Sequence, residues 1–478
     1  MWRIVVPALG LALVACTVGP DYVKPPAPTP VAFKELDGWK PATPREAASD
    51  QDWWAIYHDP VLDNLESQID ISNQTLKASE AAYREATALV DEARSQAFPT
   101  AAAAASAQRS SLSAASGRGG ESERIIENQF TVAPSVTWAP DIWGRIRRTV
   151  ESNVANAQAS AADLAAARLL AEATLATDYL ELRVLDEERT VLDNSVAAFQ
   201  KSLDITKNQY TAGVAAQTDV ITAETELENT QAQLINVGVQ RAVFEHAIAV
   251  LTGKPPAELT ITPVKMSREI PVVPPGLPST LLERRPDIAA AERTMQAGNA
   301  LIGVAIAAYY PDIELTASAN FTSTMLQNLL SLSNSAWSIA ASANETVFDA
   351  GLRSAQVAAA RATYDEDVAN YRETVLTAFQ QVEDELSTLR ILEQQASVQD
   401  RALQSARLAV QLNLNQYQAG TVSYTNVVVA QTTALNDELT VLGILENRLV
   451  ASVALVQAVG GGWNTSKLPP ATKITADP

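Results

Sequence analysis

The sequence predicts a mainly α-helical protein with a small β part, built from two copies of one α-β-α unit. Three observations support this prediction: an internal duplication, long stretches without proline, and short segments in which apolar and polar residues alternate. A shift of 207 residues superimposes Gly144 on Gly351 and Gly253 on Gly460, and no insertion interrupts the register between these landmarks. Because one such unit cannot readily bury its apolar surface alone, we expect the two copies to pack together.

A second match divides the chain into segments. At a shift of 212 residues, Phe98-Pro99 pairs with Tyr310-Pro311, so a loop between Pro99 and Gly144 must absorb the difference between the two shifts. The expected organisation is a signal peptide over 1–15, an N-terminal segment over 16–60, repeat 1 over 61–253, a proline-rich linker over 254–286, repeat 2 over 287–462 and a tail over 463–478.

The two longest proline-free stretches predict unusually long helices. Residues 145–210 and 352–417 are equal in length and rich in residues that favour helix formation. Their apolar residues recur at heptad-type spacing, and at 1.5 Å per residue each helix would reach about 100 Å. Shorter helices, expected to stack end to end beside the long ones, are predicted over 61–97, 218–251, 287–309 and 425–459. A tube wall and a solid coiled-coil rod both fit this pattern.

Between the helices of each copy, the period of the apolar residues changes to two. Residues 313–321 and 337–343 alternate as strands do, and 313–321 is long enough to cross a bilayer when tilted, so a hairpin is predicted over about 313–347. The first copy predicts a fainter hairpin over about 100–138, turned at 117–121. Pro134 is expected to cause a bulge or a bend. A soluble hairpin packed on helices is the alternative interpretation.

The first residues predict an exported lipoprotein. Arg3 precedes an apolar run over 4–14 that has signal-peptide proportions and is too short to span a bilayer. The run ends in Leu13-Val14-Ala15-Cys16, which resembles the lipobox of bacterial lipoproteins, where cleavage leaves the cysteine as an acylated N-terminus. An ordinary signal peptide with an incidental cysteine is the alternative. Because a lone thiol has little other use in an oxidising periplasm, we expect lipid attachment at Cys16.

Composition excludes several functions. The formal charge of −20 disfavours binding to nucleic acid or to anionic lipid. With two histidines and one cysteine, the chain has few metal ligands, and we expect no metal or cofactor. It has no Gly-x-Ser-x-Gly motif, and residues 252–255 lack the spacing of a phosphate loop, so no enzyme activity is expected. No run of 18 apolar residues follows the signal, so we expect strands rather than helices to cross any membrane.

Four predicted strands cannot close a membrane barrel, because an open sheet edge in lipid leaves polar backbone groups unpaired. Closure therefore requires several chains. Two protomers would give eight strands and a barrel filled by its own side chains, whereas three would give twelve strands and a lumen. We prefer the trimer because a wide pore fits a tube of helices beneath it.

Several separate motifs lie between residues 16 and 463. They are CTVGPDY at 16–22, DIWGR at 141–145, LLERRPDI at 281–288 with AAE at 290–292, and FDAG at 348–351. Together they resemble the outer-membrane factor family, the lipoprotein exit ducts of bacterial tripartite efflux systems. The resemblance implies a homotrimer with a 12-stranded transmembrane β-barrel on a long periplasmic α-helical barrel. Residues 20–60, 254–286 and the tail would form its equatorial belt.

The resemblance also implies the partners and the activity. A periplasmic membrane-fusion adaptor would bridge the duct to an inner-membrane transporter of the resistance-nodulation-division type, which supplies the energy. The duct itself, held in outer-membrane lipid, would conduct small toxic compounds passively. A channel for polypeptide secretion is the alternative within transport. A lipid-anchored periplasmic coiled-coil scaffold is the alternative outside transport.

The predicted functional residues lie at two helix hairpins, 210–219 and 417–426. Each long helix ends in Tyr-x-Ala-Gly, where Gly213 and Gly420 are expected to adopt the left-handed conformation that reverses the chain. Thr218 is the expected cap of the next helix, and Asp219 would complement its dipole. By resemblance, these tips contact the adaptor and constrict the lumen. The tip residues predicted to contact the adaptor are Tyr210, Gly213, Thr218, Asp219, Tyr417 and Gly420.

The constriction is predicted at four residues that follow the second glycine. In the family, aspartates often face the constriction from these positions. Here the matching residues are Asn426 and Val429, with Thr421 and Thr425 nearby. We therefore expect closure through a smaller or more apolar ring with weaker cation binding.

Overall fold

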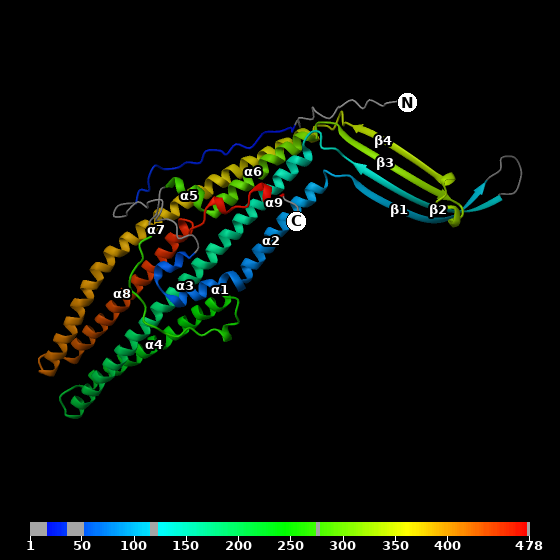
Figure 1. Cartoon of the computed structure of the whole chain (residues 1–478). Coiled ribbons are helices and arrows are strands. Elements are labelled where there is room, and N and C mark those ends of the chain that lie inside the picture. The colour runs from blue at the N-terminus through cyan, green and yellow to red at the C-terminus, as the bar shows by residue number, and fades with distance from the viewer. Residues whose placement is uncertain (1–16, 36–51, 115–122, 274–277, 476–478) are drawn as a thin grey trace.

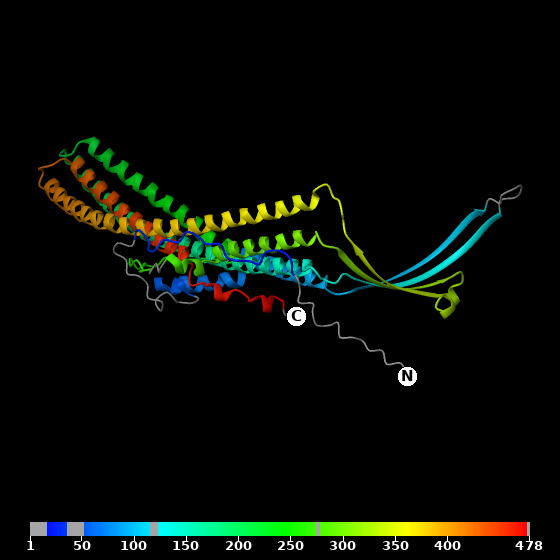
Figure 2. The same ribbon diagram turned by 90° about the horizontal axis from the view of Figure 1, so that it is seen from above.

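The computed structural model describes residues 17–35, 52–114, 123–273 and 278–475. The molecule is long and thin, with a bundle of helices at one end and a four-stranded sheet at the other (Figure 1). The first described residues lie where the helices meet the sheet, about midway along the molecule (Figure 2). The predicted turn at 117–121 lies outside the described residues.

The sheet contains strands from both copies in the order β1-β2-β3-β4, all antiparallel. Its members are β1 (Thr100–Ala114), β2 (Glu123–Trp138), β3 (Asp312–Ser323) and β4 (Ser335–Asn344). One face carries apolar pairs such as Val132 opposite Phe321, and the other carries hydroxyl groups such as those of Ser318 and Ser338, 2.9 Å apart. No helix covers either face, so each protomer leaves an apolar surface and two sheet edges open.

Pro134 interrupts the β2–β3 pairing without shifting its register. Val132 pairs with Phe321 and Ser135 with Ser318, so the count of residues is the same on both strands. The intervening residues, Ala133 and Pro134, have no partner on β3, although both pair with β1 on the other side. Proline has no amide hydrogen to donate, which explains the gap. The equal count excludes the predicted bulge in the β2–β3 pairing, and the predicted bend stays a prediction.

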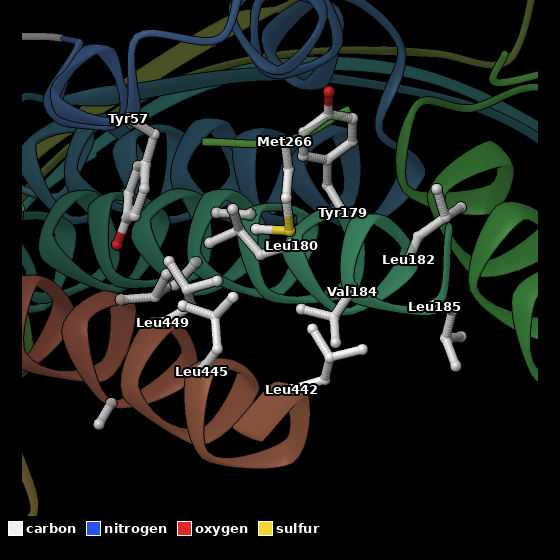
Figure 3. Packing of buried hydrophobic residues seen from close by; sticks show 14 of the residues in the cluster. Tyr57, Tyr179, Leu180, Leu182, Val184, Leu185, Met266, Leu442, Leu445 and Leu449 are labelled. Carbon is white, nitrogen blue, oxygen red and sulfur yellow. The ribbon is translucent and has the colours of Figure 1, made fainter. Parts of the chain in front are cut away.

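The two long helices, α3 (Arg145–Thr211) and α7 (Leu352–Gln418), have 67 residues each, which agrees with the predicted ranges to within one residue. The shorter helices α4 (Gln217–Leu251), α6 (Pro286–Ala307) and α8 (Tyr424–Ala458) also lie close to their predicted bounds. Two short helices complete the fold: α5 (Pro278–Arg284) and α9 (Ala471–Ile474). The main core lies where α3 meets α8, and Figure 3 shows Leu180 and Val184 beside Leu442, Leu445 and Leu449.

The single helix predicted over 61–97 is wrong, because the chain breaks at Asn73 into α1 (Pro60–Ser72) and α2 (Gln74–Ser95). Asn73 adopts an extended conformation, and its side chain accepts a hydrogen bond from the Leu76 amide at 3.0 Å. The shift of 212 residues superimposes Asn73 on Arg285, which forms the corresponding break between α5 and α6. Pro286 marks the second break in the sequence, whereas no proline marks the first.

Both breaks are joined to the end of a neighbouring helix in the same way. The Asn73 side chain donates to the Leu251 carbonyl at the end of α4, at 2.9 Å. The Arg285 guanidinium donates to the Ala458 carbonyl at the end of α8, at 3.0 Å, and also to Gln381 and Asp287. Each side chain therefore satisfies a carbonyl that the helix end leaves without an intrahelical partner.

Glycine is required where these helix ends meet the breaks. Gly253 and Gly460 follow α4 and α8 with φ of +69° and +96°, and they are related by the shift of 207 residues. A Cβ atom at either position would also collide with a carbonyl oxygen, that of Ser72 or that of Arg284. The two copies therefore use the same arrangement: a glycine after α4 or α8 lets the end of that helix contact the break between α1 and α2 or between α5 and α6.

The two long helices differ in how many other helices pack against them. α3 packs against α1, α2, α4, α6, α8 and α9, whereas α7 packs mainly against α6 and α8. Several large apolar side chains of α7 are consequently exposed, and α4 carries a similar exposed set. They are Leu376, Ile391, Val398, Leu408 and Leu412 on α7, and Ile221, Ile235, Val239, Val243 and Val250 on α4. Apolar rows of this length on a single protomer indicate surfaces that another chain covers.

Two helices are long and apolar enough to cross a membrane by length and composition alone, although the sequence analysis expected none. Helices α4 and α8 each contain an 18-residue window, with mean hydropathy 1.3 and 1.7, that is apolar enough to do so. An unbroken apolar run is absent because polar and charged residues interrupt the alanine, valine and leucine residues, among them Arg241 and Glu245 in α4 and Glu446 and Arg448 in α8. Packing accounts for this composition: half of the α8 window is buried within the protomer, and α4 carries one of the exposed apolar rows.

Replacing Arg285 by alanine should lower the free energy of unfolding by about 3 kcal/mol. The substitution removes charged hydrogen bonds and leaves the buried Ala458 carbonyl without a partner. Thermal and guanidinium unfolding of the detergent-solubilised protein, followed by helical circular dichroism, would measure the change. Arg84→Ala, at an exposed position of α2, is the control and should change stability by less than about 0.5 kcal/mol. Equal effects of the two substitutions would contradict the capping role of Arg285.

Candidate conduit, helix-hairpin tips and anchor region

The end of the molecule farthest from the sheet consists of two helix hairpins, α3–α4 and α7–α8 (Figures 1 and 2). Gly213 and Gly420 have φ of +75° and +72°, which confirms the predicted left-handed conformation. The Gly213 amide donates to the Tyr210 carbonyl and the Val214 amide to the Gln209 carbonyl, each at 2.9 Å. The second hairpin repeats this pattern at Gly420. Nothing lies within 4 Å of a Cβ atom at either glycine, so backbone conformation alone requires them.

The predicted capping role of Thr218 is wrong. Helix α4 begins at Gln217, so Thr218 is its second residue and Ala216 occupies the capping position. Alanine has no side-chain acceptor, and the Asp219 carboxylate instead accepts a hydrogen bond from the Ala216 amide at 3.2 Å. Asp219 thereby satisfies one of the free amides at the start of the helix and complements its dipole, as expected.

The two tip tyrosines have different environments although the duplication relates them. Tyr210 is 47% exposed, whereas Tyr417 is 9% exposed. The Tyr417 ring lies 5.3 Å from that of the buried Tyr424, and its hydroxyl group donates to the side chain of Gln209 on α3. Burial raises the pKa of both Tyr417 and Tyr424, so both hydroxyls stay protonated and able to donate at neutral pH. Tyr417 therefore joins the two hairpins, while Tyr210 stays available to a partner.

Two further contacts join the hairpins, and the sequence analysis did not predict them. The Gln431 amide on α8 donates to the Ser202 hydroxyl on α3 at 3.2 Å. The Thr432 hydroxyl on α8 donates to the Glu226 carboxylate on α4 at 2.8 Å. All three contacts connect the first copy to the second. No local spacing signals them, because the partners are about 200 residues apart.

The four residues predicted at the constriction are all exposed in the protomer. Thr425, Asn426 and Val429 lie within the first two turns of α8 at spacings that place them on one face. Thr421 lies apart from them in the turn, where its hydroxyl donates to the Gln416 carbonyl at 2.9 Å. The duplication relates Asn426 to Asp219 and Val429 to Thr222, so the acid present in the first hairpin is absent from the second.

At the other end of the helices, aromatic side chains gather at the end of the sheet that adjoins the helical bundle. Phe98 and Tyr310 precede β1 and β3, Trp138 ends β2, and Phe348 follows β4. All four are at least 36% exposed. A ring of exposed aromatic residues at the ends of strands is typical of the boundary between lipid and water. This end of the sheet therefore has the composition of a membrane interface.

The N-terminal segment begins beside this interface. The Val18 amide donates to the Trp143 carbonyl at 3.1 Å, and the buried Arg148 donates to the carbonyls of Val18 and Gly19 and to Asp21. Cys16, the predicted site of lipid attachment, lies outside the described residues. The residues that immediately follow it are thus held where the helices meet the sheet.

From there the segment runs along the helices toward the middle of the bundle (Figure 2). Lys24 forms an ion pair with Glu292 on α6 at 2.6 Å. The amides of Lys34 and Glu35 donate to the Glu383 carboxylate on α7 at 2.6 and 2.9 Å. These contacts fasten the strap, residues 17–35, to the second copy.

Within the described ranges, no group of three or more His, Cys, Asp and Glu side chains is arranged to hold a metal ion. The features that stand out are instead an uncovered sheet, an incomplete helical wall and two closed hairpins. An uncovered sheet and an incomplete helical wall are surfaces that further protein chains can cover, and they suit a channel better than a catalytic site.

Comparison with known proteins supports this interpretation. The family model described as outer membrane efflux protein matches residues 65–254 and 277–461. A probable efflux pump outer membrane protein, TtgC of Pseudomonas putida, is 29% identical over 94% of this chain and 93% of its own. The cation efflux system protein CusC of Escherichia coli is 27% identical over 95% and 97%. The solved outer-membrane channel OprN superposes with a TM-score of 0.86, 29% identity and coverage of 94% and 100%.

Proposed function

The chain belongs to the outer membrane efflux protein family, and we propose that it is the outer-membrane exit duct of a tripartite efflux pump. The observation that carries the proposal is the four-stranded sheet, which is uncovered on both faces and open at both edges. Hydrocarbon offers no hydrogen-bond partners to an open edge, so a sheet of this kind enters a membrane only as part of a closed barrel.

Three copies complete the conduit. Twelve strands close a barrel with its apolar face toward lipid and its serine-rich and threonine-rich face toward a lumen. The exposed apolar rows on α4 and α7 are covered by neighbouring copies, which closes the helical wall in the periplasm. The protein performs no chemistry. It conducts small toxic compounds passively while a resistance-nodulation-division type transporter in the inner membrane supplies the energy.

A periplasmic adaptor docks on the helix-hairpin tips. Tyr210, Gly213, Thr218 and Asp219 form one tip, and Tyr417 and Gly420 belong to the other. Tyr210 is the tip side chain best placed to contact an adaptor, because it is half-exposed and makes no hydrogen bond through its hydroxyl within the described residues. Tyr417 has a different role, holding the two hairpins together through Gln209.

Deleting the gene should sensitise cells to several small toxicants, and the wild-type gene should restore resistance. The purified trimer in planar bilayers should show discrete conductance steps, because the lumen is continuous when the tips open. Susceptibility profiling and single-channel recording would measure the two effects. If susceptibility stayed the same while secretion of a polypeptide failed, the alternative transport function would replace efflux. A periplasmic scaffold would show no conductance steps.

Lipid attachment at Cys16 should be lost in Cys16→Ser. Val18 and Arg148 lie near the aromatic end of the sheet, and this position supports attachment of a lipid that would enter the inner leaflet of the outer membrane. Labelled palmitate should enter the wild-type protein and not the variant, whereas Thr17→Ser, the adjacent conservative change, should keep the label. Continued labelling of Cys16→Ser would disprove the assignment.

The constriction lies at Thr421, Thr425, Asn426 and Val429 and binds cations weakly because it lacks a carboxylate. Asn426→Asp with Val429→Asp should therefore make conductance sensitive to millimolar divalent cations, with a reduction of at least about threefold. The matched control is Thr222→Asp, because the duplication relates Thr222 to Val429 on the other hairpin. Single-channel recordings with and without Mg²⁺ would measure the effect. Equal conductance of wild type and double variant in Mg²⁺ would place the constriction elsewhere.

A further inference from the structure

A cavity of about 470 Å³ lies beside the first copy, away from the tips and the sheet. It is bounded by α1, the middle of α3, the 3₁₀ turn Trp53–Tyr57 and the glycine-rich segment that follows α8. Its volume falls within the range of small-molecule sites. The side chains that matter for its chemistry are Trp54, Glu66, Asp70, Glu172, Trp463 and Lys467.

Glu66 is the most unusual residue of this cavity. Its side chain lines the cavity, yet the residue is only 2% exposed, and neither carboxyl oxygen has a hydrogen-bond partner among the described residues. Burial, followed by the nearby carboxylates of Glu172, Asp63 and Asp70, raises the pKa of Glu66 to about 10. A buried carboxyl group without a partner is costly, so a group that the described part of the chain does not supply would stabilise it.

The groups that face Glu66 do not neutralise it. Glu172 accepts a hydrogen bond from the Trp53 indole at 3.0 Å, and burial raises the pKa of Glu172 to about 7. Arg168 forms an ion pair with Asp70 at 2.9 Å. Lys467 donates to the Gly462 carbonyl at 3.1 Å. Asp52 also lines the cavity, so acids outnumber bases and both bases have other partners.

The walls of the cavity favour an organic cation over a metal ion. The described residues contain no cluster of three ligands suited to a metal. Two indole side chains, Trp54 and Trp463, line the cavity together with the carboxyl groups. Aromatic faces beside carboxylates are the combination that recognises alkylated ammonium groups, because the ring quadrupole and the negative charge both attract a large, weakly hydrated cation.

We propose that this cavity binds an organic ammonium ion, one in each protomer, with Glu66 and Glu172 as counter-ions and the two indoles as walls. The proposal concerns a site in the wall of the protein and does not depend on its conducting activity. Above the pKa of Glu172, where that carboxyl group is already ionised, no bond forms or breaks apart from the loss of the Glu66 proton. The protonated acid and the free cation become a carboxylate–ammonium pair and a proton released to solvent. Affinity therefore rises with pH.

The test uses the purified full-length trimer and benzyltrimethylammonium, titrated by isothermal calorimetry in buffers of different ionisation enthalpy. We expect saturable binding and release of close to one proton per site at about pH 8.5, where Glu172 is already ionised and Glu66 is not. Affinity should be up to about tenfold higher for each unit rise in pH. Benzyl alcohol, a neutral probe that keeps the benzyl group and lacks the trimethylammonium head, should not bind. E66Q should bind at least about tenfold more weakly and release no proton.

Two further variants keep the proposal falsifiable. E446Q, which removes a half-buried acid of α8 outside the cavity lining, should bind like the wild type. E172Q should weaken binding while keeping the proton release that depends on Glu66. The proposal is overturned if the wild type shows no saturable heat, if benzyl alcohol binds equally well, or if E66Q keeps both the affinity and the proton release.

The thermal stability of E66Q tests separately whether the Glu66 carboxyl group lacks a partner in the folded protein. Between about pH 4.5 and about pH 10, the unfolded chain has lost the Glu66 proton while the folded chain retains it, so this residue makes the fold less stable as pH rises. E66Q should therefore unfold at a higher temperature than the wild type at pH 8, with a weaker dependence of its midpoint on pH. If E66Q instead unfolded at a lower temperature than the wild type at pH 8, the Glu66 carboxyl group would already have a stabilising partner within the protein. That result would also overturn the proposal.

Discussion

Backbone hydrogen bonding in lipid is the constraint on which the rest of this molecule depends. β1 and β4 each leave an unpaired edge, and hydrocarbon offers nothing to pair with it. The same incompleteness continues into the helices, where α7 packs against fewer elements than α3 and leaves several large apolar side chains exposed. Neighbouring copies related by one symmetry axis pair the open sheet edges and also cover the exposed apolar side chains of the helices. The folded chain is therefore complete only in the assembly.

The duplication supplies a wall in which continuous helices stand beside broken ones. Each break needs a side chain that satisfies the carbonyl groups of an adjoining helix end, and the two copies use different chemistry for this purpose. A short amide serves at Asn73 and a long guanidinium at Arg285. The glycines at 253 and 460 bring each helix end close enough for either solution. Equivalent geometry has therefore been retained while the residues diverged.

The two copies differ in residues at the hairpin tips and around the cavity. At the tips, Tyr210 is available to a partner while Tyr417 joins the hairpins, and Asp219 corresponds to the uncharged Asn426. The cavity at Glu66 draws its carboxyl groups from the first copy and an indole from the residues after the second. A duplicated scaffold can change in these ways because the long helices tolerate substitution on surfaces that do not pack.

The sequence by itself determined the elements and their repetition. Helices α3 and α7, the strands and the left-handed glycines follow from local periodicity and local backbone preference, so they were predicted to within a few residues. Only the tertiary structure decided the break at Asn73 and the start of α4 at Gln217. It alone also decided the contact of Tyr417 with Gln209 and the placement of Glu66 and Trp463 around one cavity. Those features depend on groups far apart in the chain, whose approach is set by packing between helices and leaves no periodic signal in the sequence.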